Sequence, residues 1–407
     1  MTAYTNTAET SVHWQRLLAQ RTEGMKSSAI RELLKITQRP DVISFAGGLP
    51  APELFPIREI EEACRYLLRE EPKTALQYST TEGHPPLRAY LARSMSNYGI
   101  ERDPDDILIT TGSQQALDLI GKTFIDPGSK VLTGRPTYLG AIQGWRAYQA
   151  EFVTVPLDDD GMQVDEIENI LKAHDDVRFI YVLPNFHNPA GTTLPEDRRR
   201  RLVEIAREAD LIIVEDDPYG ALRYEGKSPT PISALAPERT LYLGTFSKTL
   251  TPGLRIGWVA GPREIRNRLV LAKQGSDLHT STFDQMIAND IAQRGIIEVH
   301  VEQLKKTYGS RRDTMVEALC EFWPDSCCWT RPQGGLFLWA RIPGDIDTNE
   351  MLHEALENKV AFVPGVNFYP YADGGHQAMR LNFSNAKPEM IVEGIRRLGL
   401  TVKQTLR

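Results

Sequence analysis

Short apolar runs separated by helical segments dominate the middle of the chain. Most of these runs are apolar on both sides, the pattern of strands whose two faces are buried. They predict a mainly parallel, seven-stranded sheet in an α/β domain. The seven runs are residues 107–110, 130–133, 152–155, 179–183, 211–214, 240–244 and 256–260.

The pattern changes towards both ends of the chain. We expect a helix over 27–37, a Gly/Pro-rich loop over 45–52, a long helix over 291–320, strands over 335–342 and 378–383, and a helix over 348–358. These elements predict a small α+β domain built from both termini. The expected division is 1–60 for the N-terminal arm and part of the small domain, 61–300 for the large domain and 301–407 for the small C-terminal domain.

Composition narrows the class of protein. The 407 residues are too many for one ordinary core, and 41% hydrophobic with 25% charged residues is typical of a soluble globular protein. A net charge of -7 argues against a nucleic-acid partner, and no apolar run is long enough to span a membrane. A basic run over 198–201 lies on a predicted helix, 196–209, where we expect a solvated face.

The cysteines and histidines suggest no metal site. Four cysteines form no CxxC pattern, so we expect a reducing cytoplasm rather than a zinc site or a disulfide framework. The eight histidines show no HExxH spacing.

Polar residues that follow the buried strands are the candidate chemistry, since ligands of open α/β sheets bind beyond the carboxyl ends of the strands. Gly112 and Ser113 lie at the start of a predicted helix. They form either an ordinary N-cap or a binding site for an anion. Asn188 lies in a tight turn, where its amide makes the turn or meets a ligand.

Two further strand ends carry charge. Glu215, Asp216 and Asp217 follow the run 211–214, and burying them is costly unless a cation meets them; we expect at least one in a solvated loop. Lys248 follows the run 240–244; a lone lysine there is usually a surface residue, but a partly desolvated one serves as amine nucleophile or base.

Taken together, these residues match the needs of one ligand. A phosphorylated pyridine aldehyde requires a lysine for a Schiff base and an aspartate for the ring nitrogen. It also requires hydroxyls, helix amides and an arginine such as Arg255 for the phosphate.

The chain resembles the pyridoxal-phosphate (PLP) aminotransferases of fold type I over about residues 27–400. Within them it is similar to the 2-aminoadipate and kynurenine aminotransferases. The motifs that carry the resemblance are 44–50, 76–79, 111–117, 188–191, 215–219, 245–248, 252–255 and 379–384. Two of them depart from the family pattern: Ala190 replaces Thr or Ser, and Thr245 replaces Ser.

The resemblance implies a role for each matched residue. Lys248 would form the Schiff base and move the proton between Cα and C4′, Asp216 would pair with the pyridine nitrogen, and Tyr138 would stack on the ring as the third catalytic residue. Asn188 and Tyr219 would bind the O3′ oxygen, with Asn188 also next to substrate.

The remaining implied roles concern the phosphate, the substrate and a second subunit. The phosphate would be bound by Ser113, Gln114, Thr245, Ser247 and Arg255, with Tyr78 reaching the phosphate of the neighbouring subunit in a homodimer. The substrate would meet Arg380 at its α-carboxylate, the backbone of Gly48, and Arg31 at a distal carboxylate.

The implied activity is ping-pong transfer of the α-amino group of an L-amino acid to 2-oxoglutarate. If Arg31 meets a distal carboxylate, it favours acidic donors such as 2-aminoadipate. The alternative for Arg31 is an exposed arginine on a helix surface. Aromatic donors such as kynurenine, or branched donors, remain open. A β-lyase or decarboxylase would use the same lysine and ring. A transcription regulator with an aminotransferase-like domain is disfavoured, because only about forty residues precede Ser44.

Overall fold

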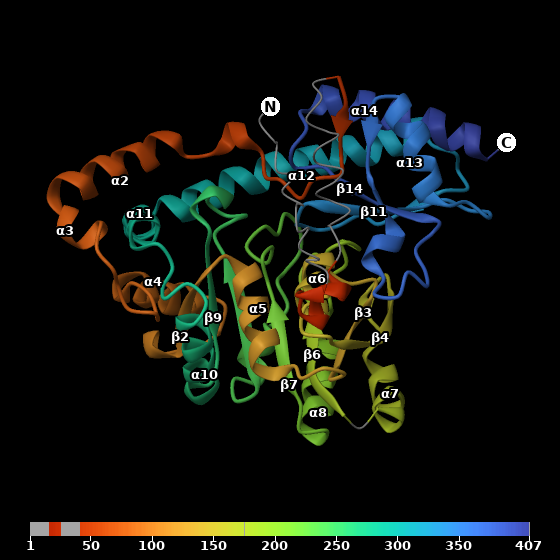
Figure 1. Ribbon diagram of the computed structural model, residues 1–407. Helices are drawn as coiled ribbons and strands as arrows, with labels where there is room; N and C mark the ends of the chain where they lie inside the picture. The colour runs from red at the N-terminus through yellow and green to blue at the C-terminus, as the bar shows by residue number, and fades with distance from the viewer. Residues whose placement is uncertain (1–15, 26–40, 175, 407) are drawn as a thin grey trace, which may run out of the picture.

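The computed structural model describes residues 16–25, 41–174 and 176–406. A large sheet lies at the centre with helices on both of its faces, and a smaller sheet lies beside it (Figure 1). The predicted helix 27–37, with Arg31, lies outside the described residues.

All seven predicted runs are strands of the large sheet, whose order is β2-β9-β8-β7-β6-β3-β4-β5. The run from β8 to β4 is parallel, β9 is antiparallel to both of its neighbours, and β5 turns back on β4. The eighth strand, β5, has two residues and is too short to leave an apolar run in the sequence. The strands are β2 (Ile107–Thr111), β3 (Lys130–Arg135), β4 (Glu151–Asp158), β5 (Gly161–Met162), β6 (Val177–Val182), β7 (Ile212–Asp216), β8 (Thr240–Thr245) and β9 (Ile256–Ala260).

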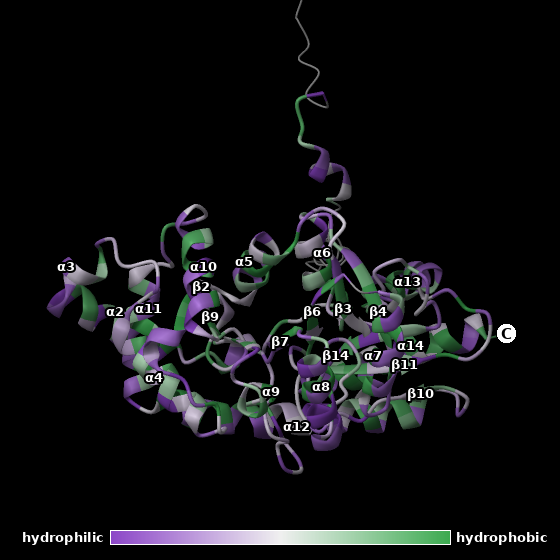
Figure 2. Cartoon of the chain, turned by 90° about the horizontal axis from the view of Figure 1, so that it is seen from below, coloured by the Kyte–Doolittle hydropathy of each residue, from purple (hydrophilic) through white to green (hydrophobic). Residues whose placement is uncertain are grey.

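Alternate residues of each strand pack on opposite faces of the sheet. In β6, Phe179 and Tyr181 join the core under α5 (Ser113–Phe124), α6 (Leu139–Arg146) and α10 (Arg263–Gln274). Ile180 and Val182 join the core under α7 (Ile167–Ala173), α8 (Glu196–Glu208) and α9 (Ile232–Leu235). The central positions of the strands are therefore apolar on both faces, and several of the strands are drawn in hydrophobic green in Figure 2.

A third group of helices packs at the β2–β9 end of the sheet. It contains α2 (Ile57–Glu70), α3 (Pro72–Ala75), α4 (Pro85–Ser96) and α11 (Thr282–Gln293). The long helix expected over 291–320 is present as α12 (Ile296–Phe322), but its predicted start is wrong, because α11 ends at Gln293 and α12 begins after Gly295. Gly295 has φ 68, a left-handed conformation that interrupts the helical path and that glycine adopts readily.

The smaller sheet has the order β10-β11-β14-β13 and is covered by α13 (Thr348–Glu357) and α14 (Pro388–Thr405). Its strands are β10 (Cys328–Trp329), β11 (Phe337–Arg341), β13 (Val363–Pro364) and β14 (Ala378–Asn382). Near the start of the chain, β1 (Ile43–Ser44) pairs with β12 (Val360–Ala361), so both ends of the chain build this unit. The limits at residues 60 and 300 remain predictions. Short 3-10 helices cover Gln20–Gly24, Pro52–Leu54, Pro104–Asp106, Val164–Glu166, Pro252–Leu254 and Gly365–Phe368.

The basic run of α8 differs from expectation at one position. Arg198 and Arg200 pair with surface carboxylates, but Arg199 is fully buried. Its guanidinium donates to three backbone carbonyls and to Asn185 Oδ1 at 2.7 Å. The expectation of a solvated face is therefore wrong for Arg199, which joins α8 to the loops that follow β6 and precede α9.

We expect Arg199→Met to lower the free energy of unfolding by about 3 kcal/mol, because it leaves several buried acceptors without a donor. Arg200→Met is the matched control; its pair with Glu196 is at the surface, and its loss should change stability by less than about 1 kcal/mol. Urea unfolding of the two variants and the wild type measures both effects. Equal unfolding midpoints for the two variants would contradict the assignment.

Candidate active site

The topology brings the predicted polar residues to one edge of the large sheet. Strands β6, β7 and β8 are parallel, so Asn188, Asp216 and Lys248 lie at or beyond their carboxyl ends. Because β9 is antiparallel, its beginning lies at this same edge and brings Arg255 there.

Lys248 lies at the centre of this group and is half-buried. Its Nζ donates to the carbonyl oxygen of Gly48 at 2.6 Å. Burial lowers the pKa of Lys248 to about 8, and the positive charges of Arg380 and Arg255 act in the same direction. A much larger fraction of this amine is therefore neutral, and nucleophilic, near pH 7 than for an ordinary lysine.

Asp216 is the last residue of β7 and is 2% exposed. Tyr181 donates its hydroxyl to Asp216 Oδ2 at 2.7 Å, whereas the buried Oδ1 has no hydrogen-bond partner. Burial raises the pKa of Asp216 to about 7. A buried carboxylate oxygen without a donor is costly, so this atom is suited to a ligand that brings an N–H.

The two other acids of this run are also held by hydrogen bonds. Glu215 is fully buried and accepts from the backbone N–H groups of Ile232 and Ser233 at 2.9 and 2.7 Å. Asp217 is half-buried and accepts from Asn185, Tyr242 and the backbone of Gly220. Glu215 and Asp216 are thus buried at the end of β7, and only Asp217, in the loop that follows, is partly exposed.

Arg380, in β14, reaches the edge from the smaller sheet. It is 1% exposed and donates to Asn188 Oδ1 at 2.9 Å and to the carbonyl oxygen of Ala46 at 2.6 Å. The guanidinium lies over the rings of Phe337 and Phe368, 4.2 and 5.1 Å from their centroids. Burial lowers the pKa of Arg380 to about 10, so the side chain stays protonated at neutral pH, and its Nε has no partner. It offers a fixed cation to an anionic group.

Two other predicted residues, both tyrosines, lie around these groups. Tyr219 is buried, hydrogen-bonds Asn188 and packs edge-on against Phe337 with the ring centroids 5.8 Å apart. Tyr138 precedes α6, and burial and the charge of Asp216 raise its pKa, while Arg380 and Arg255 act against this rise. The aromatic rings and the charged groups therefore face a common space.

A cradle for an anion lies at the start of α5. Gly112 precedes the helix with φ 72, and a Cβ there would come within 2.4 Å of the Arg255 guanidinium. Arg255 donates to Ser247 Oγ at 3.4 Å, and Thr245 donates its hydroxyl to Ser247 Oγ at 3.0 Å. The N–H group of Ser113 lies in the first helical turn, where backbone donors have no helical acceptor. Two hydroxyls, a guanidinium and a helix N-terminus thus converge.

The structure does not bring every predicted residue into this group. The Gln114 side chain donates to the carbonyl oxygen of Gly140 at 3.0 Å, so its backbone N–H, in the first turn of α5, is the group left for an anion. Tyr78 is 78% exposed and packs edge-on against His279, with the ring centroids 5.7 Å apart. Arg31 lies outside the described residues.

A cavity of about 630 Å³ lies behind the site. Its walls include Tyr90, Tyr98, Asp217 and Tyr242. Of the predicted site residues in the described ranges, Thr245 alone lines it. Phe246 and Thr249 also line it, so the cavity borders the segment that carries Lys248, although Lys248 itself is not part of its wall.

Comparison with known proteins identifies the family of this chain. The sequence model of "Aminotransferase class I and II" matches residues 41–398. The chain belongs to this family. It is 47% identical to the aromatic-amino-acid aminotransferase 1 of Thermococcus litoralis over 98% of this chain and 96% of that protein. It is 43% identical to the 2-aminoadipate transaminase of Thermus thermophilus over 97% and 98%. The solved structure of the Pyrococcus horikoshii kynurenine aminotransferase has a TM-score of 0.93 and 44% identity, covering 97% of this chain and 99% of that one.

This aminotransferase uses pyridoxal phosphate, and its residues fit that group at both ends. The unpartnered Oδ1 of Asp216 suits a protonated ring nitrogen. The cradle at Gly112 and Ser113 suits a phosphate, and Lys248 is the amine with lowered pKa near both. Within the described residues, no helix is both long and apolar enough to cross a membrane.

Sequence reasoning missed several residues of the aminotransferase site. Tyr181, which bonds Asp216, is 35 residues away from it in sequence, and Phe337 and Phe368 come from other segments. A tyrosine inside the apolar run 179–183 is a weak signal, because a buried hydroxyl requires a partner. Nothing in the sequence names that partner.

The lowered pKa of Lys248 predicts its reactivity in cofactor-free protein. Because the free amine reacts and burial disfavours the ammonium form, modification of Lys248 by an acylating reagent should be half-maximal near pH 8. Peptide mass spectrometry across a pH series measures it. Arg255→Met removes a positive charge, so the midpoint should move to higher pH. A wild-type midpoint near 10.5, the ordinary lysine value, would contradict the prediction.

Proposed function

We propose that the protein transfers the α-amino group of an L-amino acid to 2-oxoglutarate in a ping-pong reaction at the Lys248 site. The observation that carries the proposal is the unpartnered Oδ1 of Asp216 in a site that also holds Lys248. A buried aspartate with a free oxygen supports binding of a protonated ring nitrogen, which family membership requires.

Lys248 acts as nucleophile and then as base. When bound, pyridoxal phosphate supplies an aldehyde and a ring that draws electrons from the substrate Cα. Lys248 would hold the cofactor through its amine and, when that amine is free, would take the proton from Cα and return it at C4′. Its lowered pKa supports both steps, because a base must be neutral before it accepts a proton. Asp216 would accept the hydrogen bond of the protonated ring nitrogen through its unpartnered Oδ1.

Other residues orient the cofactor and substrate. Asn188 and Tyr219 provide an amide and a hydroxyl for the cofactor O3′ oxygen, and Tyr138 provides a ring for stacking. Ser113, Thr245, Ser247 and Arg255, with the N–H of Gln114, bind the phosphate. These assignments are supported by the convergence of the same groups at one sheet edge.

Arg380 selects substrates with an α-carboxylate. Its buried guanidinium donates to Asn188 and Ala46 and retains an unpartnered Nε, so a carboxylate can gain bonds here without the cation being moved. The fork geometry of arginine favours a bidentate carboxylate. Simple amines lack this anchor and should be poor donors. Gly48 borders the same space through its carbonyl oxygen.

For the donor, we propose 2-aminoadipate and related acidic amino acids, with aromatic donors accepted as well. The names of the relatives support both kinds, since one is a 2-aminoadipate transaminase and another an aromatic-amino-acid aminotransferase. The acidic preference rests on Arg31 as the cation for a distal carboxylate.

The functional unit is proposed to be a homodimer in which Tyr78 serves the partner's phosphate. In the single chain, the Tyr78 side chain is 78% exposed and its ring contacts His279. An exposed tyrosine on a loop beside the cradle strand β2 supports a role across an interface. A cytoplasmic location is proposed with it; Cys64, Cys320, Cys327 and Cys328 are free thiols.

The activity is tested by a half-reaction. With an amino donor alone, the cofactor-loaded protein should convert stoichiometrically to the pyridoxamine form, 2-aminoadipate and aromatic donors should react, and 2-oxoglutarate should reverse the conversion. Lys248→Ala should lower turnover by at least about 10³-fold, because it removes nucleophile and base together. Absorbance and product analysis measure both.

Two results would overturn the proposal. One is full multiple-turnover activity of Lys248→Ala. The other is release of ammonia or carbon dioxide without formation of the pyridoxamine form, as a β-lyase or a decarboxylase would give.

The shared site is tested by mixing two inactive variants. Lys248→Ala removes the amine of a subunit's own site, and Tyr78→Ala removes the hydroxyl given to the partner's site. A mixed dimer then keeps one intact site, so a mixture that has exchanged subunits should regain up to about a quarter of wild-type activity. No recovery, with exchange demonstrated by mass spectrometry, would contradict a Tyr78 that acts across the interface.

A further inference from the structure

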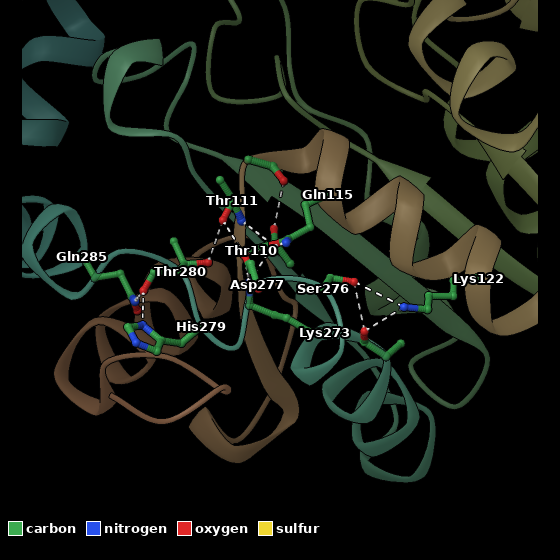
Figure 3. A network of polar contacts seen from close by, with 12 residues as sticks. Thr110, Thr111, Gln115, Lys122, Lys273, Ser276, Asp277, His279, Thr280 and Gln285 are labelled. Atoms are coloured by element: carbon green, nitrogen blue, oxygen red, sulfur yellow. Dashed lines mark hydrogen bonds and ion pairs between the residues drawn. The ribbon is translucent and has the colours of Figure 1, made fainter. Parts of the chain in front are cut away.

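An ion pair between a buried lysine and an exposed aspartate lies beside the anion cradle. The side chain of Lys273, in α10, is 0% exposed, and its Nζ donates to both carboxylate oxygens of Asp277 at 2.8 Å and to Gln115 Oε1 at 2.6 Å (Figure 3). Burying a lysine is costly unless its charge and its three N–H groups are matched, and here they are. No step of the amino transfer uses Lys273.

The pair is connected directly to the turn that forms the cradle. Gln115 Oε1 also accepts the backbone N–H of Thr111 at 2.8 Å, and Gln115 Nε2 donates to Asp277 Oδ2 at 2.7 Å. The Thr111 hydroxyl donates to the same Asp277 oxygen at 3.0 Å. Thr111 immediately precedes Gly112 and Ser113, so these bonds fix the backbone from which the cradle N–H groups project.

The far side of the pair is anchored as well. Thr280 Oγ1 lies 3.2 Å from Thr111 Oγ1 (Figure 3). The carbonyl oxygen of Thr280 accepts hydrogen bonds from Gln285 Nε2 and from His279 Nδ1, each at 2.8 Å. Gln285 is fully buried and accepts the backbone N–H of His84. The segment that carries Asp277 is therefore held from both sides, and a displacement of the pair would be passed to the cradle.

The charge balance of the pair also matters for an anion. Asp277 bonds the turn that would receive a phosphate, and an unneutralised carboxylate there would repel it. Lys273 cancels this charge. Burial raises the pKa of Asp277, but the hydrogen bonds from Lys273 and Gln115 and the Lys273 charge outweigh it, so the group stays ionised at neutral pH.

We propose that Lys273 and Asp277 are positioning residues for the cofactor phosphate: through Gln115 they hold the turn 111–113 in its anion-binding shape while adding no net charge. The proposal rests on the proposed function, in which this turn binds the phosphate. It assigns to the pair an effect on phosphate binding and none on the bonds that Lys248 forms or breaks.

The test compares two ligands that differ only in the phosphate. Full-length protein is freed of cofactor by dialysis and titrated with pyridoxal phosphate and with pyridoxal. Lys273→Met and Gln115→Met should each weaken pyridoxal phosphate binding by at least about tenfold, since each breaks a charge-assisted or buried link to the turn. Pyridoxal affinity should stay within about twofold of wild type, because that ligand makes no use of the cradle.

Lys122→Met is the matched control. Lys122 also joins α5 to the end of α10, through the Ala272 carbonyl oxygen at 3.3 Å and Ser276 Oγ at 3.4 Å, but at the other end of α5 (Figure 3). Its removal should leave both affinities unchanged.

Each outcome decides the proposal. It is overturned if both ligands weaken in parallel, if both variants bind pyridoxal phosphate as the wild type does, or if Lys122→Met has the same effect. Should Lys273→Met fail to fold, Gln115→Met decides alone, since it keeps the ion pair. Failure of the proposed function is distinct from these results, because the wild type would then show no preference for the phosphorylated ligand.

Discussion

The rest of the site depends on the burial of Asp216 at the carboxyl end of β7. The chain gives this carboxylate one hydroxyl, from Tyr181, and leaves its second oxygen without a donor. A buried acceptor in that state destabilises the fold by about 1–3 kcal/mol, and the neighbouring strands must supply that energy through apolar packing. The sheet meets this requirement because its central strands are apolar on both faces. The unpartnered Oδ1 of Asp216 is then available to accept a hydrogen bond from a ligand.

The positive groups around Asp216 also oppose folding while they prepare the site for a ligand. Arg380 is buried with its Nε unpaired, and the charges of Arg380 and Arg255 lower the pKa of Lys248. Like charges gathered in one place oppose folding, yet together with burial, which is the larger cause, they lower the pKa of Lys248 and so raise the fraction of the amine that is neutral. The net charge of -7 therefore says little about the ligand, since the field at the strand ends is set by a few nearby groups.

The sequence was sufficient for the parts of this site that local pattern determines. Apolar runs predict the seven main strands, and the rule that ligands bind beyond strand ends points to Lys248 and to the three acids 215–217, among which only the family resemblance singles out Asp216. The sequence was insufficient where a contact joins distant segments, as in the hydrogen bond from Lys273 to Gln115, two residues that are 158 positions apart. It also failed at Arg199, because four consecutive arginines cover all sides of a helix and one of them must face the core. The break at Gly295 was missed because the apolar pattern continues across it.

The bonds that the chain makes across the site indicate how a substrate is recognised. Lys248 bonds Gly48, 200 residues away, and Arg380 bonds Ala46 and Asn188, so loops from the N-terminal segment, the large sheet and the small sheet meet at these atoms. A ligand that enters must replace the bonds it displaces with bonds of its own, or leave buried donors unpaired. In the proposed reaction an α-carboxylate would do this for Arg380, and an uncharged group would not. The proposed selectivity for amino acids over amines would then follow from the bonding demands of the buried groups alone.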